Sequence, residues 1–137
     1  MLAEAGLGLL SAVIAVRALP FRHTARLLGL REATLPDATA EQLERAERVG
    51  WAIRAVAARA PWTSTCLMQA VAGAALLRRR RIPAELHLGV AKDAADPDGL
   101  AAHAWLTCAG HVLTGDGPHP ERWAVLGVYC VGAAERP

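Results

Sequence analysis

The hydrophobic period of this chain changes at Ile82-Pro83, and this change restricts the fold more than any other feature of the sequence. Before the dipeptide, apolar residues recur every three or four positions, which is typical of helices. After it, apolar and polar residues alternate, which is typical of half-buried strands. Helices that precede a run of short strands predict an α+β domain, in which a small antiparallel sheet follows the helices.

Capping residues and prolines set the expected limits of the helices. Pro20 ends the first helix, because the residue before a proline avoids the helical region. Thr39 starts a later helix with a capping box, since Gln42 stands at the third helical position. The predicted helices span Leu2–Leu19, Phe21–Leu30, Thr39 to the residue before Pro61, and Ser64 or Thr65 to Leu77.

Four strands are expected in the second part of the chain, and one turn among them predicts a register. The predicted strands span Ala84–Ala91, His103–Cys108, His111–Thr114 and Trp123–Val131. Ala109-Gly110 is expected to form a two-residue hairpin loop between the second and third of them. With that loop, His103 lies directly opposite Asp116 on the same face, with the Cβ atoms roughly 4.5–5.5 Å apart.

Length and composition predict one domain that works in a reducing compartment. A chain of 137 residues fits a single compact domain, with a helical part over 1–60 and a further helix and the sheet over 61–137. A net charge of +2 is too small for a nucleic-acid binder, whose basic surplus is larger and clustered. Three cysteines, an odd number, argue against a disulfide framework and indicate the cytoplasm.

The first helix contains an uncharged apolar stretch from Ala5 to Val16, bounded by Glu4 and Arg17. A membrane span needs roughly 20 apolar residues, so this stretch is too short. A secretory signal starts with basic residues, whereas the early charge here is acidic. We therefore expect a buried helix of a cytoplasmic protein, with contact to a membrane surface or a partner as the less favoured alternative.

Cys66 is the first residue with an expected chemical role, because it opens a helix directly after Trp62-Thr63-Ser64-Thr65. At a helix N-terminus, unpaired N–H groups and the positive end of the dipole favour the thiolate, which is the reactive form of cysteine. Cys66 is thus a candidate nucleophile. The alternative is a buried apolar cysteine, which is the common fate of a lone free thiol.

His103 and Asp116 are the expected partners of this nucleophile. A carboxylate beside an imidazole holds one ring nitrogen and leaves the other facing a nucleophile, as in a catalytic triad. Taken separately, His103 is equally a satisfied strand histidine and Asp116 a turn residue. The order Cys66, His103, Asp116, however, is the order of papain-like and transglutaminase-like cysteine enzymes.

Residues near this predicted triad are candidates for binding a substrate. Trp105 shares the face of His103 and is expected to form a cleft wall, while His87 lines the cleft or is exposed. The predicted substrate-binding residues are Trp62, Trp105 and His87. Trp51 and Trp123 are expected in the core, a role that is also open to Trp62. Cys108 and His111 have CxxH spacing, but two ligands do not make a zinc site, and no second pair is evident. No metal and no organic cofactor is expected.

Several segments resemble one family, the transglutaminase-like cysteine peptidases of lasso-peptide biosynthesis, which remove the leader from a ribosomally made precursor. The matching segments are RALPFRHTARLLGL (17–30), WTSTCLMQA (62–70), LLRRRRIPAELHLGVAKD (76–93) and AHAWLTCAGHVLTGD (102–116). The resemblance implies that Cys66 is the nucleophile, His103 the histidine and Asp116 the acid of the triad. Family members usually carry Gly where Arg81 stands here, at a position that suits a left-handed helix cap.

The resemblance also implies partners for this chain, as the standalone peptidase half of a split enzyme. These are the precursor peptide, a separate leader-recognition protein of the RiPP recognition element type, and an ATP-dependent lasso cyclase that takes the freed core peptide. Two alternatives stay open. One is an acyl transferase of the transglutaminase type, and the other is a catalytically inert peptide-binding subunit of the maturation complex.

Overall fold

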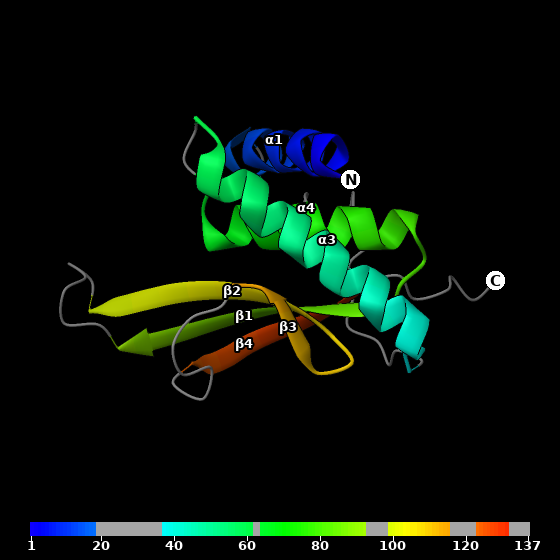
Figure 1. The fold of residues 1–137 in the computed structure, drawn as a ribbon. Coiled ribbons are helices and arrows are strands. Elements are labelled where there is room, and N and C mark those ends of the chain that lie inside the picture. Colours follow the sequence, from blue (N-terminus) through cyan, green and yellow to red (C-terminus); the bar gives the residue numbers. More distant parts are fainter. Residues whose placement is uncertain (19–36, 62–63, 93–98, 116–122, 132–137) are drawn as a thin grey trace.

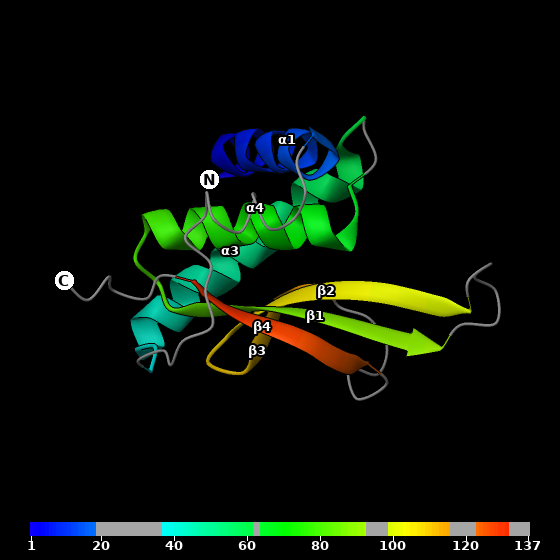
Figure 2. The same cartoon turned by 180° about the vertical axis from the view of Figure 1, so that it is seen from behind.

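A computed structural model describes residues 1–18, 37–61, 64–92, 99–115 and 123–131. Within this part, three helices cover one face of a four-stranded antiparallel sheet (Figures 1 and 2), so the predicted α+β class is confirmed. The elements are α1 (Leu2–Ala18), α3 (Ala40–Arg59), α4 (Cys66–Arg79), β1 (Ala84–Lys92), β2 (Leu100–Cys108), β3 (His111–Thr114) and β4 (Ala124–Val131). The strand order in the sheet is β3-β2-β1-β4. The predicted helix over Phe21–Leu30 lies outside the described residues.

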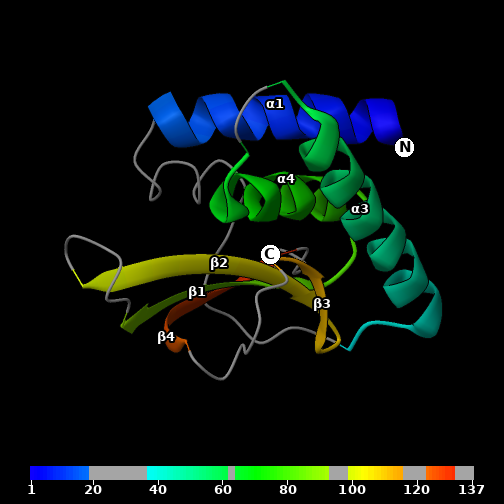
Figure 3. The same cartoon turned by 60° about the vertical axis from the view of Figure 1, so that its left-hand side comes forward.

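Helix α4 lies between α1 and the sheet, and it holds the centre of the core (Figure 3). Its approach to β2 is close at Gly73, where a Cβ atom would lie 2.7 Å from Cδ2 of Leu106. Large apolar side chains from every layer meet here, among them Leu9, Ile53, Leu77, Leu86 and Leu106. Each such burial contributes roughly 1.5–3 kcal/mol, so the packing of the three helices on the sheet stabilises the fold.

Local capping chemistry forms the two helix starts that the sequence predicts. Thr39 Oγ1 accepts a hydrogen bond from the Gln42 backbone N–H at 3.1 Å, and the Gln42 side chain accepts one from Thr39 N–H at 2.9 Å. At α4, Thr65 Oγ1 accepts from the Met68 N–H at 3.3 Å, and the Met68 sulfur lies 3.4 Å from the Thr65 nitrogen. Both predicted starts are confirmed, and Cys66 is the first residue of α4.

The C-terminus of α4 ends in a left-handed cap, although an arginine occupies the position. Arg81 has φ +55°. Its N–H bonds to the carbonyl of Arg78 at 3.1 Å, and the N–H of Ile82 bonds to the carbonyl of Leu77 at 3.0 Å. This is the Schellman pattern, in which the residue after the cap adopts the left-handed region. The left-handed cap, a conformation that suits glycine, is therefore formed here by Arg81.

The β2–β3 hairpin begins with the predicted register but does not keep it. Ala109 and Gly110 form the turn with φ +49° and +80°, and Cys108 pairs with His111 as expected. The register then shifts, because Leu106 pairs with Thr114 and Leu113 is an extra residue that forms a β-bulge. The predicted register is therefore wrong at Leu106, and Asp116, which that register placed opposite His103, lies outside the described residues.

Two predictions about the helix surfaces also need correction. α1 buries Leu9 and neighbouring small residues, but Leu7 is 68% exposed and Ile14 is 60% exposed. Among the described elements, α1 contacts α3 and α4 on one side, which leaves these side chains on the other. Trp51 on α3 is 58% exposed, because the helical rotation takes it away from the buried stripe that includes Val49 and Ile53. In the described part of the chain, no helix is both long and apolar enough to cross a membrane.

Candidate functional site

Cys66 lies where the sequence places it, at the positive end of a helix. The Thr65 cap fixes the first turn, and Gln69 Nε2 donates to the carbonyl of Ser64 at 3.4 Å, which holds the preceding residue against the helix. The Cys66 side chain is half-buried and packs against the apolar core between the helices and the sheet. Cys66 is therefore accessible in part, whereas the thiols of Cys108 and Cys130 are buried.

His103 is fixed on β2 by a hydrogen bond to the backbone that follows β3. Its Nε2 lies 2.7 Å from the carbonyl oxygen of Gly115. A carbonyl only accepts hydrogen bonds, so in the neutral ring Nε2 carries the hydrogen and Nδ1 is the acceptor. A backbone carbonyl thus supplies, in the described structure, the orienting contact that the sequence assigns to Asp116. The ring is left with the nitrogen that a general base needs.

Two tryptophans stack against the His103 ring. The ring centroids of His103 and Trp105 are 5.7 Å apart with planes at 22°, and those of His103 and Trp123 are 4.9 Å apart with planes at 28°. Gly89 pairs with His103 across the β1–β2 ladder, and a Cβ atom there would lie 3.0 Å from atoms of both tryptophans. The absence of a side chain at Gly89 is what allows the two indoles to approach the histidine.

His87 extends this stack on the other side of Trp105. Its ring lies parallel to the indole, with the planes at 2° and the centroids 5.1 Å apart. Its Nε2 is 3.0 Å from Thr107 Oγ1 and 3.5 Å from a carboxylate oxygen of Glu85. Burial lowers the pKa of His87 below the ordinary histidine value, and the Glu85 carboxylate opposes this shift.

The structure thus brings together three of the predicted site residues and adds one. His87, His103 and Trp105 form one row of rings, which Trp123 completes. Trp123 was expected in the core, and its place in the row depends on how β4 pairs with β1. That pairing carries a register shift at Leu88/Gly89, which strand patterns do not reveal. Trp62 and Asp116 lie outside the described residues.

The sheet separates this row of rings from Cys66. Leu106 contacts α4 at Gly73, so its side chain points toward the helices. Successive side chains along a strand alternate between faces, and β1 and β2 pair without a bulge here, so His103 and Trp105 project from the opposite face. Cys66 belongs to the helix side. Among the described residues, no hydrogen bond joins Cys66 to His103.

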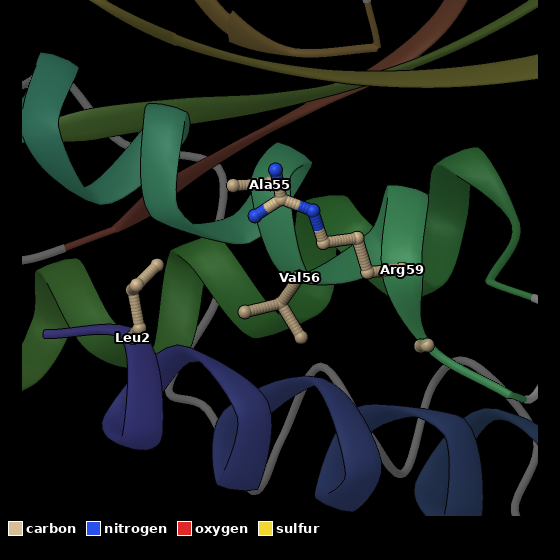
Figure 4. A pocket seen from close by; sticks show the side chains of 5 residues that line it. Leu2, Ala55, Val56 and Arg59 are labelled. Atoms are coloured by element: carbon tan, nitrogen blue, oxygen red, sulfur yellow. The ribbon is translucent and has the colours of Figure 1, made fainter.

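The other surfaces of the described residues carry none of the predicted site residues. The hollow drawn in Figure 4 lies between α1 and α3 and is lined by Leu2, Ala55, Val56, Arg59 and Ala60. None of the predicted site residues lines it. Within the described ranges, no group of three or more His, Cys, Asp or Glu side chains is arranged to hold a metal ion.

Comparison with known proteins identifies a family. The profile of the transglutaminase-like superfamily matches residues 9–128, a range that includes Cys66, His103 and Asp116. Searches of curated proteins and of solved structures gave no significant match. Transglutaminase-like domains are typically cysteine proteases or transferases, so the match indicates an activity of the cysteine peptidase or acyltransferase type.

Proposed function

The chain belongs to the transglutaminase-like superfamily, and we propose that it is a cysteine endopeptidase that removes the leader from a lasso-peptide precursor. The superfamily supports the class of chemistry, and the resemblance of the segments around Cys66 and His103 to lasso leader peptidases supports the substrate. The observation that carries the proposal is the state of His103. Its ring is clamped by two tryptophans and donates from Nε2 to Gly115, which leaves Nδ1 as the proton acceptor.

In the proposed reaction, the Cys66 thiolate attacks the carbonyl carbon of the last leader residue. The Cys66 backbone N–H is the expected donor to the oxyanion that forms. When the C–N bond breaks, His103 gives its proton to the leaving amine, which becomes the N-terminus of the core peptide. Asp116 stabilises the charged imidazole. Water then hydrolyses the leader thioester, which releases the leader acid and regenerates the thiol.

This chemistry requires a contact between Cys66 and Nδ1 of His103 that the described arrangement does not contain. β3 pairs with β2 only between Leu106 and Cys108, so the part of β2 that carries His103 is an edge among the described residues. We propose that the contact between Cys66 and His103 forms at this edge of β2 when the precursor binds. A separate leader-recognition protein would deliver the precursor, and the lasso cyclase would take the freed core peptide.

The experiment is mass spectrometry of a precursor peptide incubated with this protein and a leader-recognition partner. The wild type is compared with Cys66→Ala, and Cys108→Ala serves as the control for removal of a thiol. The proposal predicts one cut at the leader–core junction, present with the control and absent with Cys66→Ala. A precursor that stays intact with every protein would contradict it. A cross-linked product in place of two fragments would show the acyl transferase activity instead.

The separation of Cys66 from His103 by the sheet favours a second candidate function, the inert peptide-binding subunit. The row of rings, in which Trp105 is buried and His87, His103 and Trp123 are partly exposed, is suited to stacking against side chains of a peptide. This alternative predicts that Cys66→Ala binds the precursor and supports maturation as well as the wild type. The precursor assay therefore distinguishes the two functions.

A further inference from the structure

The bulge of β3 presents a backbone carbonyl to helix α3. Leu113 has no partner residue in the β2–β3 register. Nη1 of Arg54 lies 2.5 Å from its carbonyl oxygen, so the guanidinium donates a hydrogen bond to the bulged residue. A buried carbonyl without a partner costs roughly 1–3 kcal/mol, and a charged donor is a strong partner for it. Arg54 thus stabilises the bulged register of the hairpin.

α3 approaches the bulge closely because a glycine lies one turn before Arg54. A Cβ atom at Gly50 would lie 2.7 Å from the Leu113 carbonyl oxygen and 3.1 Å from the Leu113 Cβ. Residues four apart share one face of a helix, so Gly50 and Arg54 present their contacts to the same point of β3. Both are needed for the short contact between α3 and the bulge.

The bulge decides which residue lies beside His103. Leu113 and Thr114 are buried in succession, whereas a regular strand would alternate them between faces. The shift brings Gly115 against β2, where its φ is +80° and a Cβ atom would lie 2.8 Å from Cβ of Trp105. In that position the Gly115 carbonyl accepts the hydrogen bond from His103 Nε2 at 2.7 Å.

From this series of contacts we propose that Arg54 is a positioning residue for His103. Arg54 holds the carbonyl of Leu113, the bulge brings Gly115 beside β2, and the Gly115 carbonyl selects the tautomer of His103 with hydrogen on Nε2. Arg54 is proposed to act on His103 through the backbone of Leu113 and Gly115. The catalytic consequence rests on the proposed function, whereas the control of the tautomer depends on the contacts alone.

The test is ¹⁵N NMR of the histidine rings of the full chain at pH 8, which is above the ordinary titration range of histidine. The His103 signals are assigned by their loss in His103→Gln. The wild type is expected to show His103 in the single tautomer with hydrogen on Nε2. Arg54→Gln is expected to show a mixture of both tautomers, and Arg54→Lys, which keeps one charged donor, is expected to restore the single form. The control is Arg48→Gln on the same helix, where the arginine is exposed and paired with Glu44.

A single Nε2–H tautomer in folded Arg54→Gln would overturn the proposal. If that variant fails to fold, Gly50→Ala tests the same contact, since its Cβ must push α3 away from the Leu113 carbonyl while the charge of Arg54 is kept. An unchanged tautomer in Gly50→Ala would equally overturn it. Cleavage of the precursor is measured in parallel, with kcat expected to fall and KM to stay constant in Arg54→Gln. If the wild type cleaves nothing and Arg54→Gln still changes the tautomer, the proposed function fails and the positioning role stands.

Discussion

Gly89 lies directly opposite His103 in the β1–β2 ladder, and its missing side chain leaves the space in which Trp105 and Trp123 close on the histidine. The indoles restrict the ring from two sides, and the carbonyl of Gly115 holds its Nε2. A group held in this way loses little conformational freedom when it reacts, which is what a general base requires. The glycine is therefore part of the site although it carries no chemistry.

Gly89→Ala is expected to disturb the ring stack more than the fold. The added Cβ would lie 3.0 Å from Trp105 Cζ3 and from Trp123 Cβ, so at least one indole must move. Overpacking of this kind costs about 1–3 kcal/mol. Near-ultraviolet circular dichroism should report the displaced indoles, and urea unfolding should report the lost stability. Gly8→Ala is the control, because its Cβ would make ordinary contacts of 3.6–3.8 Å with Leu76. Identical spectra and stability for Gly89→Ala and the wild type would contradict this account.

Features that depend on neighbouring residues were predictable from the sequence. The capping boxes at Thr39 and Thr65 involve side chains three positions away, and the Ala109-Gly110 turn depends on its own two residues. Helix starts and the hairpin turn therefore agree with the expectation. The exposed side of α1 could not be predicted, because its apolar pattern does not reveal which faces of the helix pack against other elements.

The details of the site depend on contacts between residues that are distant in the chain. Sequence patterns do not reveal such contacts. The bulge at Leu113 is stabilised by Arg54, which lies 59 positions earlier in the chain. Because a shift of one residue exchanges the two faces of a strand, the bulge changes the predicted register beyond Leu113. The place of Trp123 depends in the same way on the shifted pairing of β4 with β1.

Arg81→Gly is expected to stabilise the protein. Arg81 has φ +55°, a left-handed conformation that costs a non-glycine residue roughly 1–2 kcal/mol, and glycine adopts it without that cost. Part of the gain is offset by the greater freedom of glycine in the unfolded chain, so a net gain of about 0.5–1 kcal/mol is expected in urea unfolding. Arg81→Ala removes the same charge but keeps the strained conformation. Equal stabilisation by both variants would show that charge, not backbone strain, is responsible.

The ion pair between α1 and α4 predicts an acid-sensitive contribution to stability. The hydrogen bond from Arg80 lowers the pKa of Glu4 below 4.5, with burial opposing this shift and Arg79 adding to it. A carboxyl whose pKa is lower in the folded state stabilises the fold above its unfolded pKa, and that stability is lost as pH falls through the folded pKa. Glu4→Gln is therefore expected to cost up to about 1 kcal/mol at pH 7 and less at an acid pH where the carboxyl is protonated in the folded state. An equal loss at both pH values would contradict the ionic origin.

His87 predicts a pH dependence at milder acidity. Its pKa is lowered by burial, so near pH 6 the unfolded chain binds more protons than the folded one. Stability should consequently fall as the pH drops below about 6.5, the ordinary histidine value. His87→Gln is expected to reduce the difference in unfolding free energy between pH 7.5 and pH 5.5. His111→Gln, at an exposed position, is the control. If both variants keep the wild-type difference in unfolding free energy between pH 7.5 and pH 5.5, the titration of His87 does not cause that difference.

The three thiols are expected to react very differently in the native state. Cys66 is half-buried at a helix N-terminus, whereas Cys108 and Cys130 are buried, and burial raises the pKa of the Cys108 thiol. Iodoacetamide at pH 7 should therefore modify one thiol, Cys66, as determined by peptide mapping with mass spectrometry. In denaturant, all three should react. Rapid native labelling of Cys108 or Cys130 would be inconsistent with the described packing.

The most direct test of the central claim, that Cys66 and His103 act together, is the rate at which iodoacetamide alkylates Cys66 with a non-hydrolysable analogue of the precursor peptide bound. If His103 activates the thiol, His103→Gln should slow this reaction by at least about a hundredfold, the low end of what a positioned base contributes. His111→Gln, which removes an exposed histidine outside the row of rings, should leave the rate within about twofold of the wild type. Equal rates in the wild type and His103→Gln would contradict the catalytic pair and favour the peptide-binding subunit.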